Sequence, residues 1–262
     1  MDNYKWAIRT GFHRAADTYE GAALFQREVC NQLLEFSEAY PAVTRVERIL
    51  DAGCGTGYAI PMLYGRFPRA RCFALDFAPG MLREIRRPGG PCYRICGDIE
   101  HLPIPDRSID LVWSSLALQW CSPLIALSEI ARILAPGGTT WIATLGNRTL
   151  HELRDAFAAV DEGEHVAHFP CADSWLAEVR SAGLDVLNFT NRLHRVYGVD
   201  LRSLLRDLKA IGANQVGARH RGQFLGKESW RAVEERYEKY RCSDGLLSST
   251  YDLIFLALRK PA

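Results

Sequence analysis

The sequence of 262 residues lacks an excess of charge of either sign. Its 32 Lys and Arg residues nearly balance its 31 Asp and Glu residues, which leaves a formal net charge of +1. Proteins that bind nucleic acid over a broad surface are usually strongly basic, so we expect no nucleic-acid partner. Residues 1–12 are polar and lack the apolar stretch of a secretory signal peptide. We therefore predict a cytoplasmic protein.

The sequence also lacks an uninterrupted apolar run that could cross a membrane. Residues 111–128 carry no charge, but Ser114, Gln119 and Pro123 interrupt them. A membrane-spanning helix needs about 20 predominantly apolar residues. We interpret this run as a buried strand followed by a helix, and we expect no membrane attachment.

Motifs of several other protein classes are absent. There is no P-loop of the G-x-x-x-x-G-K-[ST] type and no G-x-S-x-G nucleophile elbow. The eight cysteines are scattered and form no C-x-x-C pair, which is not the pattern of a small disulfide-bonded protein. His165 and His168 lie near three acidic residues but lack the H-E-x-x-H spacing. We interpret them as part of an exposed polar loop and predict no metal site.

The most informative motif that is present is the run of residues 50–57, Leu-Asp-Ala-Gly-Cys-Gly-Thr-Gly. It closes a short apolar strand and precedes a helical pattern. Gly53, Gly55 and Gly57 carry no side chain, which suits a backbone that turns sharply and lies against a ligand. A nicotinamide-binding fingerprint would need its third glycine one position later. Asp51 followed by G-x-G-x-G instead resembles the S-adenosylmethionine loop of class I methyltransferases.

Strand-like and helix-like segments alternate after an amphipathic helix that contains Ala22, Phe25, Val29 and Leu33. The predicted strands are residues 48–52, 71–75, 92–96, 109–114 and 139–145, and the predicted helices are residues 58–66, 81–87 and 123–134. This alternation predicts an α/β fold with parallel strands, right-handed crossovers and helices on both faces. The segment Ala135-Pro136-Gly137-Gly138 is expected to separate the last of these helices from the fifth strand.

The later part of the chain predicts two further strands and several helices. Residues 147–166 and 200–240 have helical patterns, whereas residues 184–197 and 251–258 are strand-like. The strands complete a Rossmann-like, doubly wound, seven-stranded sheet. We predict a single domain over residues 1–262, with helical insertions at about 147–170 and 200–240 that form a cap on the acceptor side.

Acidic residues that follow the second and third strands extend the cofactor motif. Asp76 ends the second strand, nineteen residues after Gly57, where a carboxylate can accept hydrogen bonds from both ribose hydroxyls. The resemblance to class I methyltransferases implies that Met81 lies against the adenine ring. It also implies that Asp98 accepts the adenine amino group and that the backbone of Ile99 meets a ring nitrogen.

A closer resemblance extends over nearly the whole chain. The segments that carry it are residues 12–19, 24–27, 50–57, 97–103, 115–121, 144–145, 150–153, 208–213 and 250–251. Together they resemble the malonyl-acyl-carrier-protein O-methyltransferases of biotin synthesis. The most specific are Leu-x-x-Gln-Trp-Cys at 116–121 and Leu-Lys-x-Ile-Gly-Ala at 208–213, whereas residues 214–248 match least.

The resemblance implies methyl transfer from S-adenosylmethionine to the free carboxylate of malonyl-acyl-carrier protein, with S-adenosylhomocysteine as product. A malonyl carboxylate is already ionised at neutral pH, so the reaction needs no general base. Positioning and the exclusion of water are expected to provide most of the catalysis. We therefore name no obligatory catalytic residue, and Tyr19 and Gln119 are the candidates.

The resemblance places Tyr19, at the start of the N-terminal helix, near the methionine end of the cofactor or near the acceptor. A tyrosine that only packs on the core is the alternative. Leu116 is expected at the cofactor. Gln119 and Trp120 follow the fourth strand and border both ligands, although Trp120 could simply be a core residue.

Residues 201–211 predict an amphipathic helix with leucines on one face. Arg202, Arg206 and Lys209 fall together on a neighbouring face. Our hypothesis is that this basic stripe meets the substrate carboxylate, the acidic carrier protein, or both. A charged helix face that is merely solvated is the other interpretation.

Two other functions remain open from the sequence. A methyltransferase of a free small carboxylic acid would share every cofactor feature and differ mainly in the cap. A non-catalytic assembly protein could retain the fold without the chemistry, but Asp51, Asp76 and the three glycines are intact, which argues against it.

Overall fold

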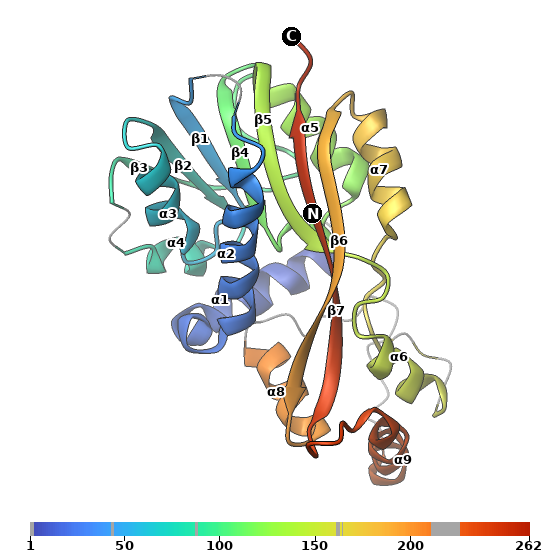
Figure 1. Ribbon diagram of the computed structural model, residues 1–262. Coiled ribbons are helices and arrows are strands. Elements are labelled where there is room, and N and C mark those ends of the chain that lie inside the picture. The colour runs from blue at the N-terminus through green and yellow to red at the C-terminus, as the bar shows by residue number, and fades with distance from the viewer. Residues whose placement is uncertain (1–2, 43–44, 87–88, 161–162, 164, 211–225) are drawn as a thin grey trace.

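Seven strands of the computed structural model form one mixed sheet (Figure 1). The structure describes residues 3–42, 45–86, 89–160, 163, 165–210 and 226–262, and only the backbone of residues 207–210. The strands are β1 (Arg48–Ala52), β2 (Arg71–Asp76), β3 (Cys92–Cys96), β4 (Ile109–Ser115), β5 (Leu134–Leu145), β6 (Asp185–Gly198) and β7 (Leu247–Arg259). Their order is β3-β2-β1-β4-β5-β7-β6, and β7 is antiparallel to both of its neighbours. The predicted doubly wound seven-stranded fold is confirmed.

Helices cover both faces of this sheet. They are α1 (Asn3–Ala22), α2 (Leu24–Glu38), α3 (Ala59–Arg66), α4 (Pro79–Glu84), α5 (Pro123–Ile133), α6 (His151–Ala158), α7 (Ala172–Ser181), α8 (Leu201–Ala210) and α9 (Lys227–Tyr237), with short 3₁₀ turns at Leu118–Trp120 and Glu238–Tyr240. Side chains of α2 and α3 join one apolar cluster, and side chains of α5 and α7 join another on the opposite face. The core therefore has two layers separated by the sheet.

The central strands are apolar because helices cover them on both faces. All of β4 except Ser115 is buried, and Trp113 packs edge-to-face on Trp141 of β5, with 6.5 Å between the ring centroids. The uncharged run at residues 111–128 is thus part of β4, a 3₁₀ turn and the start of α5. Within the described residues, no helix is both long and apolar enough to cross a membrane.

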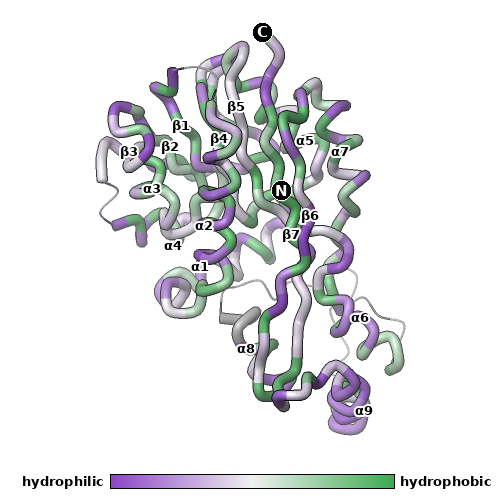
Figure 2. Tube along the Cα trace, in the orientation of Figure 1, coloured by the Kyte–Doolittle hydropathy of each residue, from purple (hydrophilic) through white to green (hydrophobic). Residues whose placement is uncertain are grey.

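The carboxyl ends of the parallel strands lie against α1, and β6 and β7 extend beyond them (Figure 1). Helices α6, α8 and α9 gather at this end of the molecule. Helix α9 is largely hydrophilic (Figure 2). The helices predicted within residues 147–170 and 200–240 thus lie at the edge of the sheet where ligands bind in doubly wound folds.

Several boundaries differ from the prediction, including the start of the last strand, which is Leu247 and not residue 251. A separate helix, α1, precedes the predicted N-terminal helix, so Tyr19 lies near the end of α1 and not at the start of the predicted helix. Strand β5 begins at Leu134, because Leu134 pairs with Ile109 before the register shifts around the Pro-Gly-Gly segment. The helix predicted over 147–166 is only α6, since Leu150 adopts a left-handed conformation (φ 53°) just before it.

Candidate active site

The glycine run forms the turn between β1 and α3. All three of its glycines have positive φ, at 77° for Gly53, 53° for Gly55 and 84° for Gly57, where other residues are strained. The backbone N–H groups of Gly53 and Cys54 both donate to the carbonyl of Leu75, at 2.8 and 2.9 Å. The loop is therefore held against the end of β2.

Two buried carboxyl groups flank this loop. Asp76 accepts hydrogen bonds from the N–H groups of Gly55 (2.9 Å) and Ala78 (2.8 Å). Burial nevertheless raises the pKa of Asp76 to about 6. Burial, together with nearby Asp76, raises the pKa of Asp51 to about 8, and the Oδ2 atom of Asp51 has no partner within the described chain. Both groups would be stabilised in their charged form by hydrogen-bond donors of a ligand.

Asp98 follows β3 and is tied to the first turn of α1. Lys5 Nζ lies 2.7 Å from Asp98 Oδ2 and 2.5 Å from Glu100 Oε2. Burial lowers the pKa of Lys5, but the bonds to the two carboxylates outweigh it and raise the pKa overall. No motif in the sequence singles out Lys5, because its partners lie more than 90 residues away.

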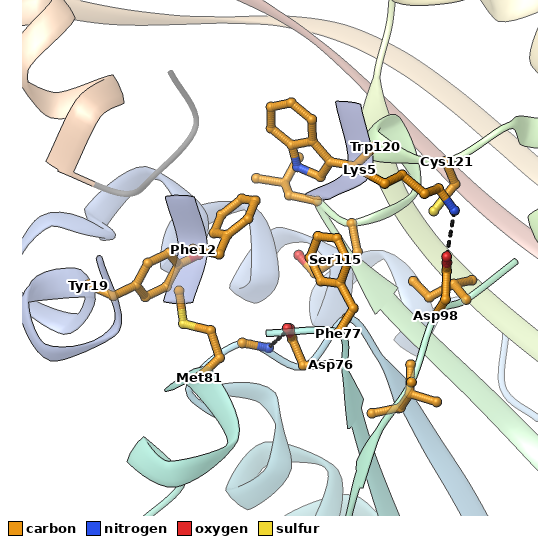
Figure 3. A pocket seen from close by; sticks show the side chains of 17 residues that line it. Lys5, Phe12, Tyr19, Asp76, Phe77, Met81, Asp98, Ser115, Trp120 and Cys121 are labelled. Atoms are coloured by element: carbon orange, nitrogen blue, oxygen red, sulfur yellow. Dashed lines mark hydrogen bonds and ion pairs between the residues drawn. The ribbon is translucent and has the colours of Figure 1, made fainter. Parts of the chain in front are cut away.

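A first cavity of about 620 Å³ lies between these groups, α1 and the start of α4 (Figure 3). Phe12, Tyr19, Met81 and Phe77 project into it. Its lining includes most of the predicted cofactor residues, namely Tyr19, Gly53, Gly55, Asp76, Met81, Asp98, Ile99 and Leu116, as well as Trp120. Gly57 does not line it; a Cβ there would lie about 3.0 Å from Ile60 and 3.1 Å from Ile85.

A second cavity of about 460 Å³ adjoins the first and contains charged groups. Asp51, Glu20, Gln26 and Arg27 line it, together with Tyr19, Gly53 and Gly55. The carboxylate of Glu20 bonds both Arg27 and the hydroxyl of Thr56, and the Nε of Arg27 is buried without a partner among the described residues. Sequence reasoning did not assign Glu20, Gln26 or Arg27 a role, although residues 24–27 were part of the resemblance.

A third cavity of about 520 Å³ is predominantly aromatic. Its described lining is Phe12, Tyr19, Phe25, Gln26, Leu116, Gln119, Trp120, Leu145, Thr149, Leu150, Phe169 and Tyr251. The predicted acceptor residues Gln119 and Trp120 are both in it. Leu116 and Leu150 have φ of 51° and 53°, and such strain in residues other than glycine concentrates at functional sites.

Tyr19 lines all three cavities. Its ring packs against the apolar cluster of Ala16, Ala78 and Met81. Burial raises the pKa of the Tyr19 hydroxyl, and the nearby carboxylates of Asp76 and Glu20 raise it further. The hydroxyl therefore stays protonated and can donate a hydrogen bond.

Two of the predicted basic residues, Arg202 and Arg206, lie apart from the three cavities. Arg202 bonds Glu234 of α9 at 3.1 Å, and its guanidinium lies 5.8 Å from the ring centre of Trp230. Arg206 is exposed, and the side chain of Lys209 is outside the described residues. Neither arginine lines any of these three cavities. Their contact with a substrate stays a prediction.

The described residues contain no group of three or more His, Cys, Asp or Glu arranged to hold a metal ion. The ring of His165 stacks on Phe157, with 4.1 Å between centroids. All eight cysteines are free thiols.

Comparisons with known proteins agree with this arrangement. A family model described as a methyltransferase domain matches residues 50–142. The fold resembles the YcgJ protein of Bacillus subtilis (TM-score 0.60, 17% identity, 88% of this chain and 99% of that one). It also resembles geranyl diphosphate C-methyltransferase from Streptomyces coelicolor A3(2), whose structure holds S-adenosyl-L-homocysteine (TM-score 0.54, 16% identity, 88% of this chain and 79% of that one).

Relatives with higher identity cover the whole chain. One malonyl-[acyl-carrier protein] O-methyltransferase, from Dechloromonas aromatica, is 44% identical over 98% of this chain and 95% of its own. Another, from Herminiimonas arsenicoxydans, is 36% identical over 99% of this chain and 97% of its own. The biotin biosynthesis bifunctional protein BioHC of Cellvibrio japonicus is 38% identical, and the match covers half of it. Identity at this level over nearly full length means that the chain belongs to the malonyl-[acyl-carrier protein] O-methyltransferase family.

Proposed function

We propose that this enzyme transfers a methyl group from S-adenosylmethionine to the free carboxylate of a malonyl group on acyl carrier protein, as a step of biotin synthesis. The observation that carries the proposal is the meeting of three cavities at Tyr19. The first cavity has acidic side chains that suit a nucleoside. The second has charged groups that suit an amino acid, and the third is lined by aromatic rings. The names of relatives at 36–44% identity supply the acceptor.

The residues of the first two cavities fit this cofactor. In the first, Asp76 and Asp98 would accept hydrogen bonds from the ribose and the adenine, and Met81 would pack on the ring. In the second, the unpartnered Oδ2 of Asp51 would accept from the ammonium group, and Arg27 would bind the carboxylate. When bound, S-adenosylmethionine supplies a methyl group activated by a positively charged sulfur.

The chain's own residues then act by orientation and by exclusion of water. The Tyr19 hydroxyl would donate a hydrogen bond to a ligand at the junction of the cavities. Phe12 and Trp120 line both the first and the third cavity and pack edge-to-face, with 5.8 Å between their ring centroids. An ionised carboxylate attacks without loss of a proton, so no residue has to remove one. Proximity and desolvation therefore account for the catalysis.

The carrier protein is proposed to meet the helices beyond the sheet. Helix α8 belongs to the predicted cap (about 147–170 and 200–240), and it carries Arg202, Arg206 and, in its last turn, Lys209. Basic side chains on a helix attract an acidic partner and speed its association. We also propose that the protein works in the cytoplasm and has no nucleic-acid or membrane partner.

The test is methyl transfer from radiolabelled S-adenosylmethionine to malonyl-carrier protein, malonyl-coenzyme A and free dicarboxylates in parallel. We expect base-labile label on malonyl-carrier protein. Label on the free acids alone would instead indicate a small-acid methyltransferase and overturn the proposed acceptor. Tight cofactor binding with no transfer to any acceptor would favour an assembly role.

A further inference from the structure

Gln26 of α2 lies between the second and third cavities. It and Tyr19 are the two described residues that line both. Its Oε1 atom is buried and has no hydrogen-bond partner in the described part of the chain. A buried amide oxygen without a partner is unfavourable, and at this cavity wall a ligand can supply the missing donor.

The third cavity contains no charged side chain among its described lining residues. Six aromatic rings line it, and its polar side-chain groups are the hydroxyls of Tyr19 and Tyr251, the Trp120 indole, Gln26, Gln119 and Thr149. Two of these are already engaged, since Gln119 Nε2 donates to the carbonyl of Leu116 (2.7 Å) and Thr149 Oγ1 accepts from the N–H of Asp252 (3.1 Å). The Gln26 amide therefore offers this cavity a neutral donor for an anion, in addition to the Tyr19 hydroxyl.

We propose that the Gln26 carboxamide bridges the two ligands. Its NH₂ group donates to the acceptor carboxylate in the third cavity, and its carbonyl oxygen accepts from the cofactor ammonium in the second. This inference rests on the proposed function and adds a residue that binds both substrates. An amide is suited to the task because it presents a donor and an acceptor from one planar group.

A neutral donor also suits the reaction better than a lysine or arginine would. The carboxylate loses its negative charge as the ester bond forms. A cation beside it would stabilise the ionised ground state more than the transition state and so slow the reaction. An amide in an aromatic cavity orients the oxygen atoms at a smaller electrostatic cost.

Two substitutions separate the two hydrogen bonds. Gln26→Glu keeps an oxygen acceptor for the ammonium but replaces the donor by a carboxylate, and Gln26→Met removes both groups at similar length. Gln32→Glu is the matched control, because Gln32 is on the same helix and lines none of the three cavities. The measurements are steady-state kinetics with malonyl-carrier protein and calorimetric binding of S-adenosylhomocysteine.

Loss of a hydrogen bond to a charged group predicts a fall in kcat/KM for malonyl-carrier protein of about 10–100-fold at pH 8 in both Gln26 variants. The affinity for S-adenosylhomocysteine should stay within about threefold of wild type in Gln26→Glu. In Gln26→Met it should weaken by more than about threefold, because the acceptor for the ammonium group is lost. Lowering the pH towards 5.5 should restore part of the activity of Gln26→Glu alone. A glutamic acid beside a second carboxylate takes up a proton and becomes a donor again.

A merely structural role for Gln26 would not produce this difference in pH profile. Equal kcat/KM in wild type, Gln26→Glu and Gln32→Glu would overturn the bridge while leaving the proposed function intact. The same holds for a Gln26→Glu loss that does not recover at low pH. A wild-type enzyme that binds S-adenosylhomocysteine but does not methylate malonyl-carrier protein would overturn the proposed function and the bridge with it.

Discussion

Gly53 is the glycine of the cofactor loop that should tolerate a side chain least. Its φ of 77° lies in the left-handed region, and a Cβ atom there would overlap the Cβ of Ala117 and lie 3.6 Å from Ile99 Cδ1. The left-handed conformation costs a non-glycine residue about 1–2 kcal/mol. Overpacking against a buried neighbour costs about 1–3 kcal/mol more. Gly53→Ala should therefore lower the free energy of unfolding by about 2–5 kcal/mol.

Gly55 provides an internal comparison, because it has the same sign of φ but a Cβ atom added to it would have no neighbour within 4 Å. Gly55→Ala should cost only the backbone contribution, about 1–2 kcal/mol. Removing the clashing atom should also rescue the first variant. Gly53→Ala combined with Ala117→Gly should regain about 1–3 kcal/mol, even though Ala117→Gly alone is destabilising by about 0.5–1 kcal/mol.

The assay is urea unfolding of the cofactor-free protein for wild type, the three single variants and the double variant. Working without cofactor separates folding from ligand binding, which Gly55→Ala should impair because its methyl group enters the first cavity. Equal losses for Gly53→Ala and Gly55→Ala would refute the steric reasoning. So would additive losses in the double variant, since independent sites show no coupling.

Three further predictions concern other parts of the molecule. Because burial raises the pKa of Asp51 to about 8, the native state holds a proton there that the unfolded chain releases above about pH 4. The contribution of Asp51 to the free energy of unfolding therefore falls as the pH rises from about 4 to about 8. In urea unfolding, the free energy of unfolding of Asp51→Asn should depend less on pH than that of wild type. Tyr237→Phe should cost about 1–3 kcal/mol in the same assay, because the buried hydroxyl donates to Ser248 O (2.9 Å); an unchanged midpoint would contradict this. Lys5→Ala should release the start of α1 from Asp98, seen as faster amide exchange in residues 3–12; unchanged exchange would show that other contacts hold the helix.

The parts of the site that the sequence predicted are those encoded locally. Asp51, Asp76 and Asp98 each follow the strand that positions them, so their spacing along the chain indicates their places at one edge of the sheet. The glycine loop is likewise continuous in sequence. For these residues, the position of a strand end and of the short turn after it was enough to predict their place in the site.

Helix α1 was missed because it does not pack on the core as an ordinary amphipathic helix does. Its fully buried residues are Ile8 and Ala16, while Lys5, Phe12 and Tyr19 line a cavity. A helix that covers a ligand site mixes polar and aromatic residues on its inner face, so the apolar periodicity is weak. The next helix, α2, has a conventional buried face and was predicted.

The start of α6 shows how contacts distant in sequence override a local pattern. The carboxylate of Asp252 accepts hydrogen bonds from the N–H and side chain of Arg148, 104 residues earlier. The N–H of Leu150 donates to the carbonyl of Thr250 in β7. These bonds hold residues 147–150 as a turn, so the helix begins only at His151.

The cofactor side and the acceptor side of this enzyme therefore differ in how they are encoded. The third cavity takes residues from α1, α2, the turn after β4, the turn after β5 and β7, so no short segment describes it. Its two strained leucines, Leu116 and Leu150, follow β4 and β5, and each is held by a backbone bond to a neighbouring strand. The sheet thus fixes the walls of an aromatic cavity from which charged side chains are absent among the described residues. For a reaction in which a carboxylate loses its charge, neutral groups on the cavity wall would favour the transition state over the ionised ground state.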